Sequence, residues 1–279
     1  PAPRRHMVAR VPTGSRTGSL HKRFGMLVGL LALATLTGTV TGPTAPQRYR
    51  IEVKAQQEVD MSAMGGGKQT SDLAVMGFVT VTMSDTTGGQ LAHIVVDSVA
   101  IPAGIELPPQ LGDAAGGAKG VFFHGLIING KAKDGLKPSA QNPLVALLAG
   151  GVENLFPGLR PTAKIGDTWS DTVKTDKNTE GVKQNSTTLL NWKVSTGTMA
   201  SMTFDATTTG TMMSEGPSPN GKQTINAKIS GTRSLTGPAI GPMTKGTIKA
   251  MQDLLVSIEG MADSIPVSAT TEVTFTIIP

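Results

Sequence analysis

The segment PTAKIGDTWSDT, residues 161–172, holds the residue types in this sequence that most resemble a chemical site. Asp167 and Asp171 flank Trp169, and carboxylates are common groups for general acid and base catalysis. A turn explains the same residues, because Gly166 can adopt positive φ and the side chain of Asp167 can accept hydrogen bonds from nearby backbone amides. Trp169 would then begin a strand and close the end of a β core. We predict a structural turn and no catalytic residue.

The same segment contains the element lysine-x-glycine-aspartate-x-tryptophan, Lys164 to Trp169, preceded by LFPGLRP. It resembles an element of uncharacterised exported bacterial β-rich proteins. The resemblance covers one short segment of the 279 residues and implies export and a β architecture. It implies no activity, because that family brings none to transfer.

Two histidines, His93 and His124, lie outside the basic leader and are candidates for metal or acid–base chemistry. Each lies in a predicted strand, QLAHIVVDSV or VFFHGLII, and no HxH or HxxxH spacing begins a metal site. The chain has no cysteine, which excludes disulfides, thiolate ligands and a cysteine nucleophile. We expect neither a metal nor a cofactor.

A third candidate, MGGGKQT at residues 64–70, has some features of a phosphate-binding loop. The pattern GxxxxGK[ST] would need glycine at Ser62 and serine or threonine at Gln69. The segment also joins two predicted strands, whereas a phosphate loop opens onto a helix N-terminus. We predict a flexible turn, and because the sequence has no GxSxG or SxxK motif either, we expect no enzymatic activity.

These candidates lie on a chain that alternates apolar and polar residues. From Tyr49 to Met61 the odd positions are mostly apolar and the even positions are polar, which predicts a strand much longer than the usual five or six residues. The segment 248–259 could be helical, but five of its six even positions are apolar, which favours a strand. Similar runs, bounded by Gly, Asn, Asp or Pro clusters, occur at 73–81, 202–206, 225–229 and 267–277.

One helix is expected over about 142–156, where leucines recur at three- and four-residue spacing. Asn142 can cap it and Pro143 fits its first turn. An apolar helix stripe needs a sheet face to lie on. We therefore predict a mainly β protein with long curved antiparallel sheets, half-barrel or two-lobed, and one short helix.

The helix divides the predicted organisation into four parts: an export signal and basic leader at 1–45, an N-terminal β half at 46–138, a helix and connector at 139–163, and a C-terminal β half at 164–279. The strand starts KQTSDLAV, KQNSTTLL and KQTINAKI resemble one another. Duplication of a β unit and shared hairpin chemistry both explain this similarity.

The leader accounts for the basic charge of the whole chain. Six of the 25 lysines and arginines lie in residues 1–45, which contain no acidic residue, so 19 basic residues face 20 acidic ones in the remainder. The leader's apolar run, Phe24 to Leu36, is too short to span a bilayer and is followed by small residues, which favours a cleaved export signal over a retained anchor. We expect a bacterial periplasmic or extracellular protein that does not bind nucleic acid and contacts membranes only through this leader.

Two functions are open at this stage. Few aromatic residues are available to fill a large curved sheet, and the eleven methionines outside the leader either line an adaptable cavity or, as we favour, fill the core. The predicted architecture is similar to half-barrel periplasmic carriers of lipids and lipoproteins, by analogy of fold alone. We expect a non-catalytic carrier of an apolar small molecule or lipid, bound between the sheet and the helix near 142–156. The alternative is a structural or assembly protein that binds other envelope proteins.

Overall fold

The computed structural model describes residues 45–105, 111, 114–179, 181–198, 200–218 and 221–279. The predicted export signal and basic leader at 1–45 lies outside the described residues except for Ala45. Within the described part of the chain, no helix is both long and apolar enough to cross a membrane.

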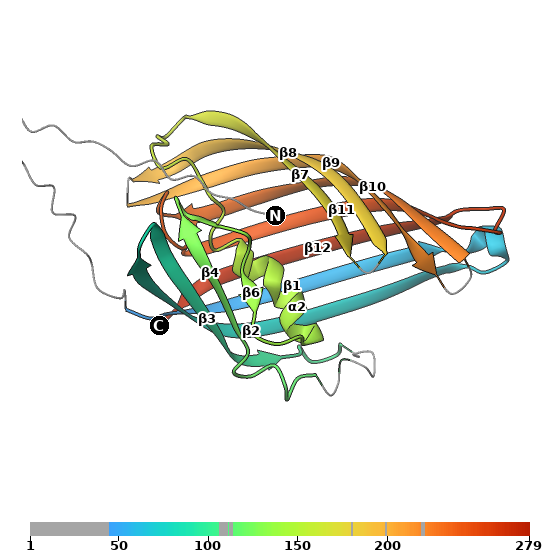
Figure 1. Cartoon of the computed structure of the whole chain (residues 1–279), viewed down its shortest axis with the longest axis horizontal. Helices are drawn as coiled ribbons and strands as arrows, with labels where there is room; N and C mark the ends of the chain where they lie inside the picture. Colours follow the sequence, from blue (N-terminus) through green and yellow to red (C-terminus); the bar gives the residue numbers. More distant parts are fainter. Residues whose placement is uncertain (1–44, 106–110, 112–113, 180, 199, 219–220) are drawn as a thin grey trace, which may run out of the picture. The chain divides into compact units, whose positions relative to one another are not determined.

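Twelve antiparallel strands form one sheet, together with a single-turn helix η1 (Ser62–Met64) and an α-helix α2 (Pro143–Glu153) (Figure 1). The predicted mainly β fold with a long curved sheet is confirmed. The strands are β1 (Gln47–Asp60), β2 (Lys68–Thr86), β3 (Gly89–Ala100), β4 (Phe122–Ile128), β5 (Lys131–Ala132), β6 (Lys137–Pro138), β7 (Thr168–Thr179), β8 (Val182–Thr198), β9 (Ser201–Ser218), β10 (Gly221–Gly237), β11 (Lys245–Ile258) and β12 (Ile265–Ile278).

The strand order is β5-β4-β3-β2-β1-β12-β11-β10-β9-β8-β7, and β6 pairs with β4 outside this path. Most neighbours are consecutive hairpins, but β1 and β12 come from opposite ends of the described chain and pair from Arg48↔Ile278 to Val59↔Val267. The N-terminal and C-terminal β segments therefore form one continuous sheet. The sheet is open, because the described strands β5 and β7 at its two edges do not pair with each other.

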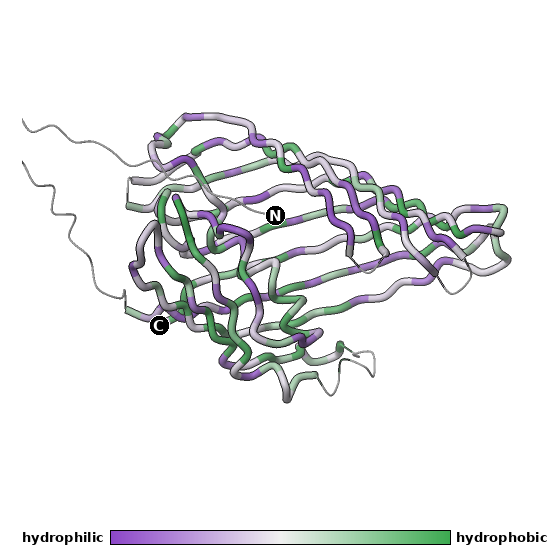
Figure 2. The backbone as a smooth tube through the Cα atoms, viewed as in Figure 1, coloured by the Kyte–Doolittle hydropathy of each residue, from purple (hydrophilic) through white to green (hydrophobic). Residues whose placement is uncertain are grey.

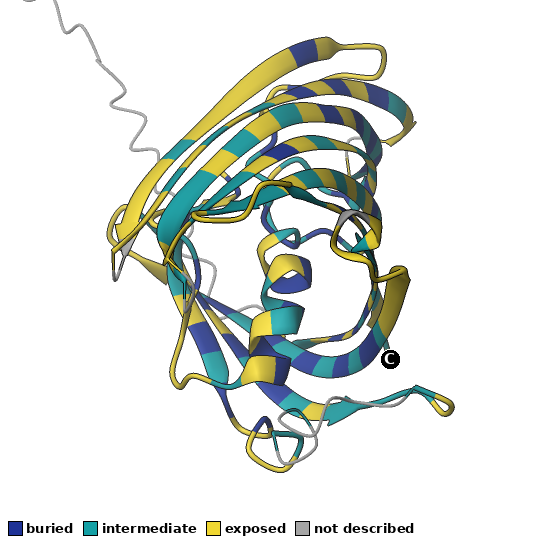
Figure 3. Cartoon of the chain, turned by 90° about the vertical axis from the view of Figure 1, so that its right-hand side faces the viewer, coloured by how far each residue is buried: buried dark blue, intermediate teal, exposed yellow. Residues whose placement is uncertain are grey.

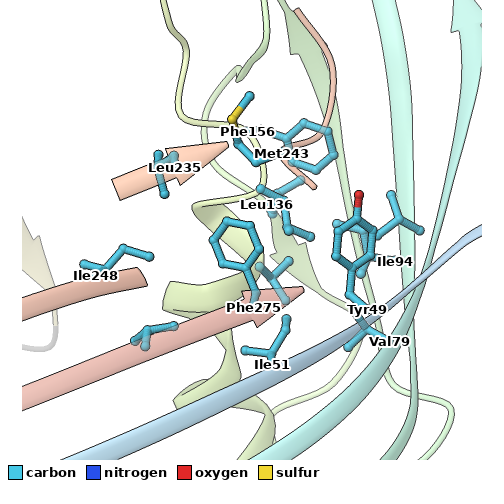
Figure 4. Close-up of a cluster of buried hydrophobic side chains, with 14 of the residues drawn as sticks. Tyr49, Ile51, Val79, Ile94, Leu136, Phe156, Leu235, Met243, Ile248 and Phe275 are labelled. Atoms are coloured by element: carbon cyan, nitrogen blue, oxygen red, sulfur yellow. The ribbon is translucent and has the colours of Figure 1, made fainter. Parts of the chain in front are cut away.

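Alternation decides which side chains face inward, and the strand register aligns them in rows across the sheet. Tyr49, Ile51 and Val53 of β1 are buried, in the phase expected from the sequence. The sheet curls around α2 (Figure 3). The apolar cluster inside the curl includes Tyr49, Ile51, Val79, Ile94, Leu136, Phe156, Leu235, Met243, Ile248 and Phe275 (Figure 4).

Helix α2 begins as the sequence predicts. The Oδ1 atom of Asn142 accepts hydrogen bonds from the backbone N–H groups of Leu144 and Val145, at 2.9 and 3.1 Å, and Pro143 occupies the first turn. The helix ends at Glu153, three residues before the predicted end, because Asn154 forms the C-cap. Its side chain donates to the carbonyl of Gly150 at 2.7 Å, which satisfies one of the free carbonyls of the last turn.

The helix packs closely on β1, β2 and β12. A Cβ atom added at Gly151 would overlap Ile51, and one added at Gly77 would overlap Leu148. Only glycine allows this close approach between helix and sheet. The space directly between the helix body and the sheet is therefore filled with side chains.

The connector after α2, residues 154–167, is hydrogen-bonded to the segments around the helix end. Its backbone hydrogen-bonds to three other segments: Gly158 N–H donates to Gly130, Met243 N–H donates to Leu155, and Val194 N–H donates to Asp167, at 3.0, 2.9 and 3.0 Å. We call the strand halves that surround α2 and this connector the core half, and the opposite halves of the strands the far half.

The far half has no such cover among the described residues. On β1 the inward Gln57 is exposed, and on β10 the inward Ile225 and Ile229 are half-buried. Hydrophobic residues gather around α2 and its neighbouring strands, whereas the far ends of β7 to β10 carry many hydrophilic residues (Figure 2). The long strands thus extend well beyond the core that they enclose.

Candidate functional site

The segment KIGDTW forms the predicted turn before β7. Gly166 has φ +91°, and its N–H donates to the carbonyl of Val194 at 2.9 Å. The Oδ2 atom of Asp167 accepts from the backbone N–H of Lys164 at 2.9 Å, and the N–H of Asp167 donates to the carbonyl of Lys164 at 3.0 Å. The carboxylate of Asp167 is thus used within the turn itself.

Trp169 is 7% exposed and faces inward from the start of β7. Its ring stacks on Trp192 of β8, with centroids 6.0 Å apart and planes 17° apart, and the guanidinium carbon of Arg160 lies 5.3 Å from its centroid. The indole Nε1 donates to Oδ2 of Asp171 at 2.9 Å. Asp167 therefore stabilises the turn, whereas Asp171 accepts a hydrogen bond from Trp169, which is anchored in the core by its stacking on Trp192.

Trp192, the stacking partner of Trp169, lines a cavity inside the curl. The cavity has a volume of about 690 Å³ and lies beyond the C-terminal end of α2, between the connector and the inner face of the sheet. We call it the inner cavity. Its apolar wall includes Phe156, Leu190, Trp192 and Val173, and its polar wall includes Lys131, Glu153, Asn154, Asp171 and Arg233.

The sequence predicts a ligand between the sheet and the helix near 142–156, and the cavity lies at the C-terminal end of that segment. The space beside the rest of the helix is filled by the contacts of Gly77 and Gly151. The cavity opens instead where α2 stops and the strands continue. Its lining is mixed rather than wholly apolar.

Arg233 is the unusual member of this lining. It lies on β10 in the same phase as Ala227 and Leu235, so its side chain projects from the inner, apolar face. Its Nη1 donates to Oδ1 of Asn154 at 3.0 Å, which is its one hydrogen bond among the described residues. Burial lowers the pKa of Arg233, although a guanidinium stays charged at neutral pH.

The acidic groups of the cavity, Glu153 and Asp171, form no ion pair with Arg233. Within the described residues, no carboxylate is within 4.0 Å of its guanidinium. Glu153 and Asp171 are both exposed, so solvent screens their charges more strongly than that of the half-buried Arg233. The cavity therefore holds a half-buried cation, Arg233, that forms no ion pair with the described residues.

His93 and His124 lie elsewhere, on exposed positions of β3 and β4. The register pairs them directly, and the ring of Phe122 lies 4.7 Å from that of His93 and 5.8 Å from that of His124. No local pattern indicates this pairing, because it depends on the register between two strands joined by a long connection. No cluster of three or more metal-ligating side chains occurs in the described part of the chain.

The segment MGGGKQT turns the chain from β1 into β2. Gly65 has φ +77° and ends the 3-10 helix η1, and Lys68 pairs with Glu58 at 2.7 Å. This hydrogen bond raises the pKa of Lys68, and the hydrogen bond from Ser62 lowers the pKa of Asp60. The segment is a hairpin connection with an exposed ion pair, and η1 is too short to provide an anion site.

A second hollow of about 910 Å³ crosses the far half of β7 to β11. Two of its three rows of lining residues, those of Lys174 and Asp176, lie in the opposite phase to the core residues and flank a row in the core phase. The hollow therefore lies between outward side chains, and we call it the outer groove. Met213 and Leu255 are exposed along it. The methionines divide between core and surface: Met83, Met202 and Met243 are buried, whereas Met64, Met213 and Met251 are exposed.

Arg233 is the site residue that sequence analysis did not identify. A signal was present, because an arginine occupies a position of β10 that alternation assigns to the apolar face together with Ile225, Ala227 and Ile229. A charged residue in an otherwise apolar phase indicates either an exposed end of the face or a specific polar contact.

Comparison with known proteins does not assign the chain to a family. No family model matches it, and no curated protein matches its sequence. Matching solved structures include mutants of the Rhodopseudomonas blastica porin, 9% identical with a TM-score of 0.26, covering 83% of this chain and 100% of the porin chain. An engineered protein described by asymmetric conductivity matches at 11% identity and a TM-score of 0.25, over 84% of this chain and 100% of that one. TM-scores this low do not indicate a shared fold.

Proposed function

We propose that this chain is an exported, non-catalytic binding protein of a bacterial cell envelope, and that its inner cavity holds a molecule with an apolar part. The observation that carries this proposal is the cavity of about 690 Å³ inside the curl of the sheet. Cavities of this size are within the range that takes small-molecule ligands. Its apolar wall offers contacts to a hydrocarbon or ring system.

The arrangement of the cavity supports binding rather than catalysis. Asp171, its carboxylate nearest the tryptophans, is used as an acceptor by Trp169, and the paired histidines lie on the outer face of β3 and β4. The lining is suited to holding a ligand between the tryptophan stack and the connector. Export is supported by the basic leader and short apolar run at the start of the sequence.

Native mass spectrometry of gently purified mature protein, followed by solvent extraction, tests ligand binding. We expect a stoichiometric adduct that extraction releases. Val173→Glu should abolish it, because Val173 lines the cavity and is 44% exposed, so a glutamate there can be accommodated without unfolding. Leu189→Glu is the matched control, since Leu189 is 37% exposed on the opposite face of the neighbouring strand.

Two results would contradict the binding role. An adduct that persists in Val173→Glu would lie outside the inner cavity, and protein that is ligand-free in every preparation would not be a carrier. The leader is tested separately by N-terminal sequencing of protein from the native envelope. We expect a start between Thr35 and Arg48, and intact chains that begin before Phe24 would exclude cleavage.

A structural or assembly role in the envelope is the second candidate. It is favoured by the outer groove, which extends from Leu255 of β11 across Met213 of β9 to the edge strand β7, and both of these apolar side chains are exposed. Crosslinking from Met213→Cys, in a chain without any other cysteine, would capture a neighbouring envelope protein if this role is correct. Crosslinked products no different from those of an exposed control, Lys245→Cys, would count against it.

A further inference from the structure

We propose that Arg233 is the headgroup contact of the inner cavity and that the ligand is an anionic amphiphile, with carboxylate or phosphate oxygens at the guanidinium and an apolar tail along the inner face. This inference rests on the proposed binding function and specifies its ligand class. It depends on Arg233, on the cavity wall around it and on the open inner face beyond.

The free donors of Arg233 are the first observation. A guanidinium has five N–H donors in a planar fork, and the described residues accept from only one nitrogen, Nη1. No side-chain nitrogen of the described residues is both fully buried and without a partner. The remaining nitrogens of Arg233 therefore keep accessible surface, and since Arg233 lines the inner cavity, they can reach a ligand there.

The fork of donors suits an oxyanion. Carboxylate and phosphate groups accept two parallel N–H bonds from arginine, and such charge-assisted pairs are stronger than hydrogen bonds between neutral groups. Arg233 is half-buried, forms no ion pair with the described residues and has lost part of its hydration, and this burial lowers its pKa. An anionic headgroup would replace the lost hydration.

The surroundings of Arg233 provide for the rest of the molecule. Trp192 lies on the same row of the sheet, connected through Ala206, and Leu190 lies one row further along the strands. Beyond them the inner face continues as half-buried apolar residues that no described element covers, among them Ile229 and Leu254. A tail that starts at Arg233 would therefore run from the closed core half toward the open far half.

Arg233 also has a structural contact, because Asn154 is the C-cap of α2. A purely structural arginine would tie β10 to the helix end and would not affect which headgroup binds. The two roles separate when ligands that differ only in charge are compared on the unmodified protein. That comparison does not depend on the stability of any variant.

Tryptophan fluorescence gives the readout, because Trp169 and Trp192 are the two tryptophans of the chain and Trp192 lines the cavity. Bromine atoms quench indole fluorescence at contact. The probes are dibromostearate, its uncharged methyl ester, and an alkyl phosphate with the same brominated chain. We expect both anions to quench at concentrations about 10- to 100-fold lower than the ester, the range for a hydrogen bond to a charged group.

The variant Arg233→Gln should bind the anions about as weakly as the ester, and Arg233→Lys should retain part of the preference. Lys228→Gln is the matched control, since it removes one charge from the outer face of the same strand. Circular dichroism and melting temperature establish that each variant is folded. If Arg233→Gln does not fold, two results still test whether Arg233 contacts the headgroup. They are the preference of the wild-type protein for acid over ester and the size of that preference in Arg233→Lys.

The outcomes distinguish this inference from the proposed function. Equal quenching by anions and ester, or an acid preference that survives in folded Arg233→Gln, would overturn the role of Arg233 and leave an apolar binding site standing. Absence of quenching by all three probes would remove the binding function as well. Tighter binding of the carboxylate indicates a fatty-acid type of ligand, tighter binding of the phosphate indicates a phospholipid type, and both support an oxyanion headgroup.

Discussion

In β1 the inward side chains of Tyr49 and Ile51 are fully buried, whereas the inward Gln57, on the same face of the same strand, is exposed. The same change occurs along β7, where Trp169 is buried and Val173 is exposed. Regular alternation continues through both halves. The two halves differ in what packs on their inner face, because α2 and the connector lie only over the core half.

This difference separates the half of the fold that supplies most of the stability from the surface next to the proposed binding site. The core half encloses the apolar cluster, and removing large side chains there should cost much of the folding free energy. The far half adds long hydrogen-bonded strands whose inner face is accessible. The inner cavity lies at the boundary, where a rigid wall meets an open surface, as expected for a site that must be both preformed and accessible.

The largest expected effect is at Trp169. Trp169→Ala removes a buried ring that stacks on Trp192 and should lower the free energy of unfolding by about 3–5 kcal/mol. Val173→Ala, on the same face of the same strand, should change it by less than about 0.5 kcal/mol, because this side chain is exposed. Urea unfolding of both variants measures the contrast, and equal losses would show that the two halves do not differ.

A second contrast uses adjacent glycines of α2. Gly151→Ala adds a methyl group that overlaps Ile51 and should destabilise by about 1–3 kcal/mol through overpacking. Gly150→Ala meets no atom within 4 Å and should stabilise the helix by roughly 0.5–1 kcal/mol. Thermal unfolding should therefore shift in opposite directions, and a tolerated Gly151→Ala would mean that the helix lies further from the sheet.

Alkaline pH tests the enclosure of the core half. Burial raises the pKa of Tyr49, whose hydroxyl donates to Oε1 of Gln47 at 2.9 Å. The pKa of Tyr49 is higher in the folded protein than in the unfolded chain. The neutral, buried hydroxyl therefore supports folding fully below pH about 10, and above that pH the free energy of unfolding falls by about 1.4 kcal/mol per pH unit. Urea unfolding at a series of alkaline pH values measures the loss.

Tyr49→Phe is the control for that measurement, since it retains every lysine that also titrates at alkaline pH. The variant should lose stability less steeply above pH about 10. Tyr49 is the single tyrosine of the chain, so its ionisation can also be followed directly by absorbance. Ionisation near the ordinary tyrosine pKa in the folded protein would contradict a closed core.

Local features of this fold were predictable from sequence. Alternation identified β1 and the ambiguous β11, and the pair Asn142-Pro143 located the start of α2. Each of these signals depends on residues close together in the chain. The predicted end of the helix was less accurate. The apolar pattern continues to Phe156, but Asn154 caps the helix and ends it at Glu153.

The pairing of distant segments was not predictable. No local pattern indicates that β1 joins β12, that His93 faces His124, or which part of an alternating face is covered. The site follows from these long-range relations, because Arg233 lines a cavity only where the connector and β7 come together. Sequence alone therefore identified the turn at Asp167 but did not locate the cavity beyond it.

The smallest expected effect is at that turn. Asp167→Asn retains a side-chain oxygen that can accept the N–H of Lys164, so the free energy of unfolding should fall by less than about 1 kcal/mol. Asp167→Ala removes the acceptor, as when a helix cap is lost, and should cost about 1 kcal/mol or slightly more. The exposed Asp176, in the far half of β7, provides the comparison, and Asp176→Ala should have almost no effect.

A structural turn requires that Asp167→Ala be less stable than Asp167→Asn and that Asp176→Ala stay near wild type. Urea unfolding of the three variants measures these differences. An Asp167 variant that kept its melting temperature but lost a defined activity would instead show that this carboxylate takes part in chemistry.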